Sequence, residues 1–286
     1  MIKVDFERER TWWDAQAPHE EEDRADEAVN RALRWREITR HLEGVRTILD
    51  VGGGTGAFSI PLAQYGFEVI HLDLSPAMLE IARLKAGGLH NIRFVEGNAV
   101  DLSSLADCSF DLVLALDGAV SFCGDRAEEA LLECCRVAGR TLIVSVLHRA
   151  RLAAQWASTS LHVLGGLAPA VYAMLERGEW HQDQYPENAA FARGSTHDYL
   201  GSLHGFLPGE LRSILEGAGL QVVRCGGVGS LAGLCPPEVL GRVLADPALF
   251  PEFVELCDAY DREVMPEGPG TEQRAGLLAV ARRADA

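Results

Sequence analysis

The stretch TILDVGGGTGAF, residues 47–58, decides the fold. It begins with a short apolar run, passes through a turn that contains four glycines and leads into a predicted helix. Gly52, Gly54 and Gly56 let the backbone turn sharply and approach a ligand closely, and the helix N-terminus offers unpaired N–H groups. The stretch therefore predicts a ligand site at the end of a strand. A glycine-rich turn alone is a weak signal, because Gly52-x-Gly54-x-x-Ala57 also fits the dinucleotide fingerprint.

Short apolar strands alternate with helices from residue 47 onward, which is typical of parallel strands joined by helical crossovers. Ser75 and Pro76 give one of these helices an N-cap and a proline in its first turn. The spacing predicts helices at 57–65, 76–85, 126–137, 208–218 and 247–260. It predicts strands at 48–51, 69–72, 92–95, 111–116, 141–146, 221–224 and 277–281. The expected fold is therefore α/β, with a Rossmann-like, doubly wound, seven-stranded and mostly parallel sheet covered by helices on both faces.

Four parts are expected along the chain. Near the N-terminus, apolar residues three or four positions apart predict a single helix: Ala28, Ala32, Trp35, Ile38 and Leu42. The Trp35 indole is expected to pack this helix onto the main domain rather than cover a ligand. After Val146 the alternation breaks for about 55 residues, and an irregular insertion of this length is typical of a lid. The expected parts are an N-terminal helical cap (1–45), a cofactor-binding core (46–147), a substrate-binding insertion or lid (148–205) and the C-terminal part of the core sheet (206–286).

The charge balance narrows the class of partner. The chain has 26 Lys and Arg against 42 Asp and Glu, a net charge of −16. This balance disfavours broad capture of nucleic acid or of an anionic membrane, although a local basic groove stays open as an alternative. The apolar run from Leu161 to Leu175 is shorter than the roughly 20 residues of a membrane span. We therefore expect no membrane association and leave the oligomeric state open.

Cysteine usage and the N-terminal segment favour a cytoplasmic protein. The segment MIKVDFERER has no apolar run behind its charges, so no secretory signal is expected. The seven cysteines include no Cys-x-x-Cys pair, and Cys134 and Cys135 are adjacent within a helical pattern. Buried thiols in a reducing compartment are the expectation, with no metal site.

Two acidic residues at predicted strand ends restrict the class of ligand that can bind there. Asp50 lies two residues before the first glycine, where its carboxylate could hold the turn or attract a positively charged group. A pyrophosphate would be repelled there. Asp73 ends the second predicted strand, and an acidic side chain at that place can accept hydrogen bonds from two ribose hydroxyls, as in NAD sites. A ribose-bearing ligand is therefore predicted.

Four segments in order carry a family resemblance: DVGGGTG (50–56), HLDLSPAMLEIAR (71–83), EGNAVDL (96–102) and FDLVLALD (110–117). In this order and spacing they resemble the class I S-adenosylmethionine-dependent methyltransferases. The resemblance covers residues 47–146 closely, and FLPGELRSILEGAGLQVV (206–223) resembles the family's final helix and strand more loosely. It implies that S-adenosyl-L-methionine is the cofactor and that the chain transfers methyl groups.

The resemblance also assigns the cofactor contacts. The family often has Asp where this chain has Asn98, and an amide oxygen can still accept a hydrogen bond from an exocyclic amine. The implied contacts are Asp50, Gly52, Gly53, Gly54 and Gly56 with the methionine moiety, Asp73 with the ribose, Leu74 and Met78 beside the adenine, Asn98 and Ala99 at its edge, and Leu116 and Asp117 near the sulfonium. Met78 equally suits an ordinary core position of an amphipathic helix.

The acceptor is less determined than the cofactor. Methyl transfer from a sulfonium depends mainly on alignment, so a general base is optional, and His148, His197 and His204 are the candidates for one. The aromatic residues of the insertion favour a planar or apolar small molecule, although they could equally form the insertion's own core: Trp156, Tyr172, Trp180, Tyr185, Phe191 and Tyr199. A small-molecule acceptor is therefore the leading hypothesis, with its acceptor atom (O, N or C) open.

Two alternatives stay open. The segment ALRWREI (32–38) and the C-terminal segments resemble bacterial enzymes that methylate a carboxymethoxyuridine in tRNA. A nucleic-acid substrate would need a basic cluster near the cofactor, for which Arg149, Arg151 and Arg193 are the candidates. An NAD-dependent oxidoreductase is a more distant third, because it would have to place a nicotinamide beside Asp50.

Overall fold

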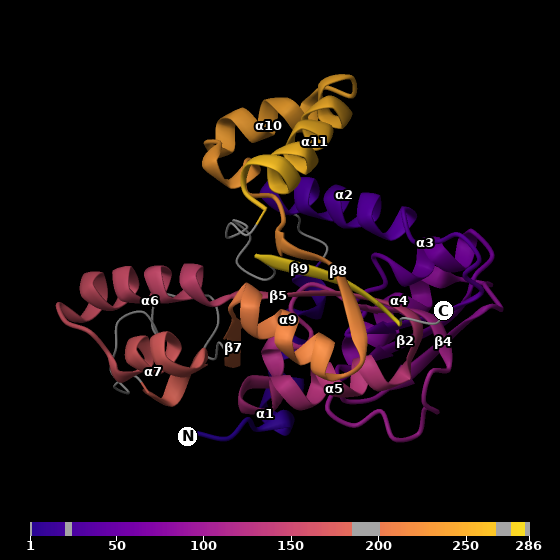
Figure 1. The fold of residues 1–286 in the computed structure, drawn as a ribbon, viewed down its shortest axis with the longest axis horizontal. Helices are drawn as coiled ribbons and strands as arrows, with labels where there is room; N and C mark the ends of the chain where they lie inside the picture. The colour runs from indigo at the N-terminus through magenta and orange to yellow at the C-terminus, as the bar shows by residue number, and fades with distance from the viewer. Residues whose placement is uncertain (1, 21–24, 185–200, 267–275, 284–286) are drawn as a thin grey trace.

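The computed structural model describes residues 2–20, 25–184, 201–266 and 276–283, and at its centre lies the expected mostly parallel sheet (Figure 1). Seven strands run in the order β3-β2-β1-β4-β5-β9-β8, and β9 is antiparallel to both of its neighbours. The α/β fold predicted from the sequence is therefore confirmed. The strands are β1 (Thr47–Val51), β2 (Glu68–Asp73), β3 (Ile92–Glu96), β4 (Phe110–Ala115), β5 (Ala138–His148), β8 (Leu220–Gly227) and β9 (Leu277–Arg283).

Both faces of the sheet are covered, which explains the continuous apolar runs of its central strands. Ile48 and Leu49 are neighbours on β1 and point to opposite faces, and both are fully buried. One face packs against α5 (Ala127–Val137) and α9 (Pro208–Gly217), and the other against α2 (Ala25–Thr39) and α3 (Ser59–Gln64). As predicted, Trp35 packs against the main domain, with its ring 5.4 Å from that of Phe58.

The helices that follow β1 and β2 begin where local chemistry dictates. Helix α4 (Pro76–Ala86) starts as predicted, because the Ser75 hydroxyl accepts a hydrogen bond from the Met78 backbone N–H at 3.1 Å. Helix α3 starts two residues later than predicted. Gly52, Gly54 and Gly56 all have positive φ angles, so the turn continues up to Phe58 before the chain becomes helical.

The N-terminal region differs from the single helix expected there. Helix α1 (Phe6–Gln16) and the 3-10 turn η1 (Ala17–His19) precede α2. The Asp5 carboxylate caps α1 by accepting hydrogen bonds from the backbone N–H groups of Glu7 and Arg8. A sequence-based search for an apolar stripe misses this helix, because its charged residues outnumber its apolar ones.

The expected irregular insertion is largely regular in its described part. It contains α6 (Arg149–Leu164), α7 (Pro169–Arg177), β6 (Glu179–His181), η3 (Gln182–Gln184) and the start of β7 (Ser202–Phe206). Strand β7 runs parallel to the end of β5, and β6 pairs with β7, so two strands join the predicted seven. Trp156 and Trp180 stack at 4.4 Å inside the insertion's own core, and Tyr172 is exposed. Tyr185, Phe191 and Tyr199 lie outside the described residues.

A second helical addition joins β8 to β9 at the top of Figure 1. The predicted helix at 247–260 is found as α11 (Leu249–Ala259), which continues into the π-helical turn η5 (Tyr260–Val264). Before it stand η4 (Ala232–Leu234) and α10 (Pro237–Ala245), which were not predicted. Ion pairs join this addition to α2: Glu37 to Arg262, and Arg40 to Asp258. No helix in the described part of the chain is long and apolar enough to cross a membrane.

Candidate functional site

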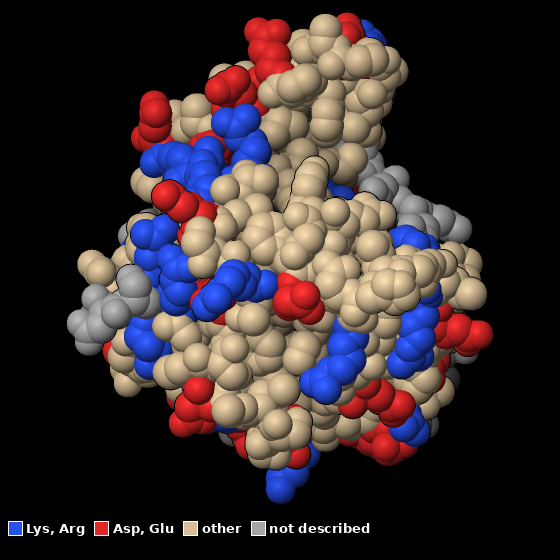
Figure 2. Space-filling model, turned by 90° about the vertical axis from the view of Figure 1, so that its right-hand side faces the viewer, with Lys and Arg blue, Asp and Glu red and all other residues tan. Residues whose placement is uncertain are grey.

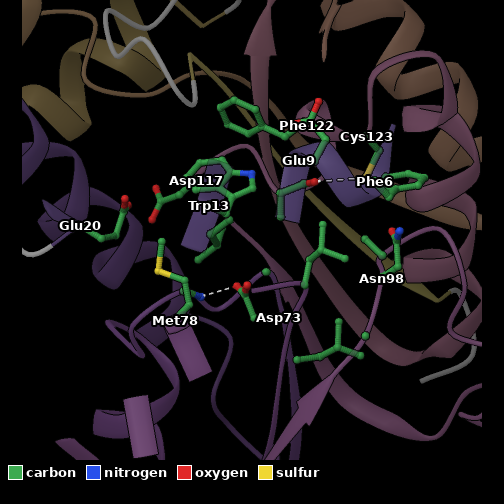
Figure 3. Close-up of a pocket in the computed structure, with 18 residues that line it drawn as sticks. Phe6, Glu9, Trp13, Glu20, Asp73, Met78, Asn98, Asp117, Phe122 and Cys123 are labelled. Carbon is green, nitrogen blue, oxygen red and sulfur yellow. Dashed lines mark hydrogen bonds between the residues drawn. The ribbon is translucent and has the colours of Figure 1, made fainter. Parts of the chain in front are cut away.

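The main cavity lies at the carboxyl ends of β1, β2 and β4, and helix α1 covers it (Figure 3). Its volume is about 750 Å³ when the open mouth is included. Carboxyl ends of parallel strands are where open α/β sheets bind ligands. A smaller hollow adjoins the cavity on the other side of the glycine turn, and Gly52 and Gly54 line both.

Packing explains why the turn after β1 needs glycines. A Cβ atom on Gly52 would lie 2.5 Å from the Ala119 side chain, and one on Gly53 would lie 2.5 Å from the His71 ring. Gly54 has a φ of +56°, which disfavours other residues, yet a Cβ there would meet no atom within 4 Å. The backbone of Gly54 is therefore open to the cavity, as close contact with a ligand requires.

A series of buried hydrogen bonds through His71 supports the glycine turn. The His71 ring joins the Ser59 hydroxyl at 2.6 Å through Nδ1 and the Gly54 carbonyl at 3.1 Å through Nε2. Burial lowers the pKa of His71 to about 4, so the ring is neutral at pH 7. Because a carbonyl can only accept, Nε2 donates to Gly54 and Nδ1 accepts from Ser59. The Ser59 backbone N–H also donates to the Asp50 carboxyl group, and these hydrogen bonds thus connect Asp50 to the turn.

Asp50 and Asp73 are buried acids with raised pKa values. Burial, and to a smaller extent the nearby carboxylates of Asp117 and Asp73, raise the pKa of Asp50 to about 7. Burial likewise raises the pKa of Asp73 to about 6, while hydrogen bonds from the backbone N–H groups of Ser75 and Gly54, each at 2.8 Å, oppose the rise. Each acid therefore favours a ligand that brings hydrogen-bond donors or positive charge.

The structure brings most of the predicted cofactor contacts together. Asp50 and Gly53 line the smaller hollow, together with Arg31 and Lys85. Gly56 lines neither space, because it turns the chain toward α3, where a Cβ atom would lie 2.5 Å from Ile60. The main cavity is lined by Gly52, Gly54, Asp73, Leu74, Met78, Asn98, Ala99, Leu116 and Asp117.

The two candidate bases with a described position, His148 and His204, lie outside the cavity lining. His148 stands before α6, where its Nδ1 accepts a hydrogen bond from the Ala150 N–H at 3.2 Å. His204 on β7 packs edge-on against Phe206, and burial lowers its pKa. Neither lines the cavity, and His197 lies outside the described residues.

The candidate basic cluster is not assembled at the cavity in the part of the chain that the structure describes. Arg149 forms an ion pair with Glu210 at 2.6 Å, and its side chain is 11% exposed. Arg151 does not line the cavity, and Arg193 lies outside the described ranges. On the face shown in Figure 2, basic side chains lie among acidic ones.

Sequence-based reasoning missed the residues that α1 and the 3-10 segment η2 (Ser121–Arg126) contribute. Phe6, Glu9 and Trp13 project from α1 into the cavity lining, and Phe122 and Cys123 from η2. The spacing of Phe6, Glu9 and Trp13, three and then four residues, places them on one helical face. That spacing after the Asp5 cap was the available signal.

Helix α1 is fixed at both sides of the cavity mouth. Near its end, Asp14 accepts hydrogen bonds from the Ser75 hydroxyl at 2.6 Å and the Ala77 N–H at 3.1 Å, at the start of α4. In its middle, Glu9 accepts a hydrogen bond from the Ser202 N–H at 2.7 Å. The helix therefore bridges the core and the inserted strands.

Asp117 lies between Glu20 and Trp13 at the cavity wall in Figure 3. It adopts a φ of +55°, an unfavourable angle for a residue with a side chain, directly after β4. Its backbone N–H donates to the Ser145 hydroxyl at 2.9 Å, and its carboxylate pairs with the buried Arg34 at 2.5 Å. These contacts hold Asp117 at the cavity wall.

The cavity lining is acidic. Four carboxylates belong to it, and the described residues that line it include no Lys or Arg: Glu9, Glu20, Asp73 and Asp117. All seven cysteines are free thiols. Among the residues with a described position, no group of three or more His, Cys, Asp or Glu is arranged to hold a metal ion.

Comparison with known proteins matches the core. Residues 49–141 match the family model described as a methyltransferase domain. The chain is 42% identical over 80 residues to the demethylmenaquinone methyltransferase of Deinococcus radiodurans, which covers 27% of this chain and 33% of that protein. It is 32% identical over 93 residues to the tRNA 5-carboxymethoxyuridine methyltransferase of Escherichia coli K12, which covers 30% of this chain and 36% of the relative. The matches span about a third of these relatives' length.

Solved structures share the whole fold at low identity. A SAM-dependent methyltransferase from Mesorhizobium loti aligns with a TM-score of 0.53 and 22% identity, over 88% of this chain and 96% of that one. A SAM-dependent methyltransferase from Methanosarcina mazei aligns with a TM-score of 0.53 and 17% identity, over 86% and 96%. At these identities the likeness shows the common fold.

Proposed function

We infer that this chain, whose residues 49–141 form a class I S-adenosylmethionine-dependent methyltransferase domain, is an active enzyme that methylates a small molecule. One observation carries the inference: a cavity at the strand ends that combines an open glycine turn, a buried acid at the end of β2 and an acidic lining. The turn and the acid suit the cofactor, and the acidic lining restricts the charge of the acceptor molecule.

For the nucleoside part of the cofactor, Asp73 is the proposed ribose ligand. Each of its oxygens already accepts one backbone N–H, and each has lone pairs left for a ribose hydroxyl. Leu74 and Met78 would flank the adenine. Asn98 and Ala99 would face its edge, and the Asn98 oxygen is held in place by the Val100 N–H at 3.1 Å.

For the methionine part, the smaller hollow offers charges of both signs. Arg31 and Lys85 suit a carboxylate, while Asp50 suits the ammonium and sulfonium groups. When bound, S-adenosylmethionine supplies a methyl group that its sulfonium already activates. Leu116 and Asp117 belong to both spaces and would separate the methionine part from the acceptor.

The chain's own contribution to the reaction is alignment. The fixed turn, the bridged helix α1 and the held Asp117 can orient two reactants at the roughly 3–3.5 Å that direct displacement requires. No described histidine lines the cavity, so the proposed mechanism uses no histidine base.

The acidic lining favours a neutral or cationic small acceptor over a polyanion. A tRNA substrate is the alternative that the E. coli relative supports, and its carboxymethoxy group would bring a further negative charge toward these carboxylates. The described lining contains no Lys or Arg that could pair with that charge, and the nearby Arg34 is already paired with Asp117.

A labelled-donor screen tests the proposal. The full chain is incubated with S-adenosylmethionine carrying a labelled methyl group and with a panel of small molecules, and the expected product is heavier by one labelled methyl group. Transfer RNA that carries 5-carboxymethoxyuridine, tested at low and high salt, is the competing substrate. Thermal stabilisation by S-adenosylhomocysteine and not by NADH is also expected, and stabilisation by NADH alone would contradict the methyltransferase assignment.

A further inference from the structure

Helix α1 forms one wall of the cavity, yet it is only lightly packed against the rest of the protein. Phe6, Glu9 and Trp13 of α1 line the same cavity as Asp73 (Figure 3). Of the 11 residues of α1, all of which are described, Glu9 and Gln16 are buried, and no apolar side chain is. A segment with few buried apolar contacts opens at a lower free-energy cost than the core around it. Helix α1 is therefore suited to move relative to the sheet.

One carboxylate oxygen joins α1 to the start of α4. Asp14 Oδ1 accepts a hydrogen bond from the Ser75 hydroxyl at 2.6 Å and another from the Ala77 N–H at 3.1 Å. These two hydrogen bonds are here called the Asp14 latch. A hydrogen bond to an ionised carboxylate is about twice as strong as one between neutral groups. The latch therefore holds the C-terminal half of α1 against α4 through polar contacts, which water can replace when the helix opens.

Ser75 connects the Asp14 latch to the proposed ribose ligand. The Ser75 backbone N–H donates to Asp73 Oδ1 at 2.8 Å, and the Ser75 hydroxyl accepts from the Met78 N–H at 3.1 Å while it donates to Asp14. The same residue thus holds the ribose acid, caps α4 and anchors α1. The latch and the nucleoside contacts therefore belong to one hydrogen-bonded segment, residues 73–78.

The residues proposed to hold the nucleoside are buried while the latch is closed. Asp73 is 8% exposed and Met78 is 2% exposed. Both line the cavity that α1 covers, so a nucleoside reaches them only through that cavity. Lids that give access to enzyme sites belong to the less stable segments of a fold, because they must open in each catalytic cycle. The light packing of α1 and its polar latch match this requirement.

We propose that α1 is a lid, that it opens to admit and release the cofactor, and that the Asp14 latch closes it on the ribose-binding segment. Because Phe6 and Trp13 of α1 line the cavity, its wall is complete only when the latch is closed. The cofactor therefore binds before the acceptor. Asp14 is a positioning residue, since it acts through Ser75 and α1 and not on the reacting atoms. The proposal rests on the proposed function, because it assigns the entry route of the cofactor to the same site.

Binding kinetics distinguish a lid from a fixed wall. The full chain is mixed rapidly with S-adenosylhomocysteine, and tryptophan fluorescence gives the association and dissociation rate constants, since Trp13 lines the cavity. If α1 must open first, both rate constants rise with the population of the open state. We expect Asp14→Ala to raise both by about tenfold or more, and to change the dissociation constant by less than about threefold. Loss of a contact from a fixed wall would raise the dissociation rate constant alone.

Two further variants separate the latch from charge and from folding. Asp14→Asn keeps an oxygen for the Ser75 hydroxyl and the Ala77 N–H but loses the charge, so both rate constants should lie between those of the unmodified chain and Asp14→Ala. Glu7→Gln removes a charge from the same helix at a side chain that is 80% exposed, and it should leave both rate constants unchanged. Hydrogen exchange at residues 6–16 should be faster in Asp14→Ala, while exchange in β1 and β4 stays the same and shows that the variant is folded. If Asp14→Ala does not fold, Asp14→Asn is the test, and both of its rate constants should exceed those of Glu7→Gln.

The outcomes that overturn the proposal are distinct from those that overturn the proposed function. An association rate constant that the Asp14 variants leave unchanged overturns the lid, even if dissociation becomes faster. Hydrogen exchange at residues 6–16 that is unchanged in a folded Asp14→Ala variant overturns the latch. In both cases S-adenosylhomocysteine still binds, and only this inference fails. If S-adenosylhomocysteine does not bind the unmodified chain, the proposed function fails with it.

Discussion

Replacing Asp50 with asparagine should remove a pH dependence of cofactor binding. The pKa of Asp50 is raised to about 7 in the unliganded protein, mainly by burial. A cationic cofactor favours the ionised carboxylate, so the proton must leave on binding. With a pKa of 7 in the free protein and a much lower one in the complex, the dissociation constant at pH 6 is about tenfold larger than at pH 8, or about 1.4 kcal/mol. The amide of the Asp50→Asn variant carries no proton to lose, and it can replace the protonated acid toward Ser59.

Calorimetric titration with S-adenosylmethionine at pH 6, 7 and 8 measures this effect. The titration of the ligand's own groups affects both proteins equally. The ratio of the two proteins' dissociation constants at each pH therefore reports the contribution of Asp50 alone. Asp73, with a pKa raised to about 6 by burial, should contribute a smaller factor of about two at pH 6 in both proteins. An unmodified protein whose affinity is the same at pH 6 and pH 8, or an Asp50→Asn variant with an unchanged slope, would refute the reasoning.

Four further outcomes are expected. Asp50→Asn should also raise the free energy of unfolding at pH 8 by up to about 4 kcal/mol in urea melts, because a raised acid pKa destabilises the fold as pH increases from about 4 to 7. Asp73→Ala should weaken S-adenosylhomocysteine binding by about 1–3 kcal/mol, while Asp101→Ala, at an exposed position, leaves it unchanged in calorimetry. His71→Leu should lower both the melting temperature and the cofactor affinity, because Ser59 and the Gly54 carbonyl lose their hydrogen-bond partner. A variant with the same melting temperature and the same affinity as the unmodified protein would show that the His71 hydrogen bonds do not support the turn. Burial alone would raise the pKa of Glu37, but its partners His41, Arg224 and Arg262 lower it to about 2. Glu37 therefore stabilises the fold above pH 4.5 and loses that contribution as pH falls toward 2, so Glu37→Gln should flatten the acid side of the stability curve measured by circular dichroism.

The sequence by itself determined the core and the residues that line the cavity at the strand ends. Periodicity is local information: the apolar run of β1, the Ser75 cap and the glycines of the turn each act through neighbours a few residues away. Asp50 and Asp73 follow directly from strand ends, because parallel strands finish at one edge of a sheet. These elements could be placed without any knowledge of distant contacts.

Only the tertiary structure decided which segments cover the cavity. In the described part of the insertion, Trp156 and Trp180 stack on each other within the insertion's own core. Helix α1, which belongs to the expected N-terminal cap, covers the cavity. It is too polar to be recognised by an apolar stripe, and it is held by contacts with residues far along the chain, such as that of Glu9 with Ser202. The raised pKa of Asp50 likewise comes from burial and from the carboxylates of Asp73 and Asp117, which other parts of the sheet bring close, and burial is a property of the assembled fold.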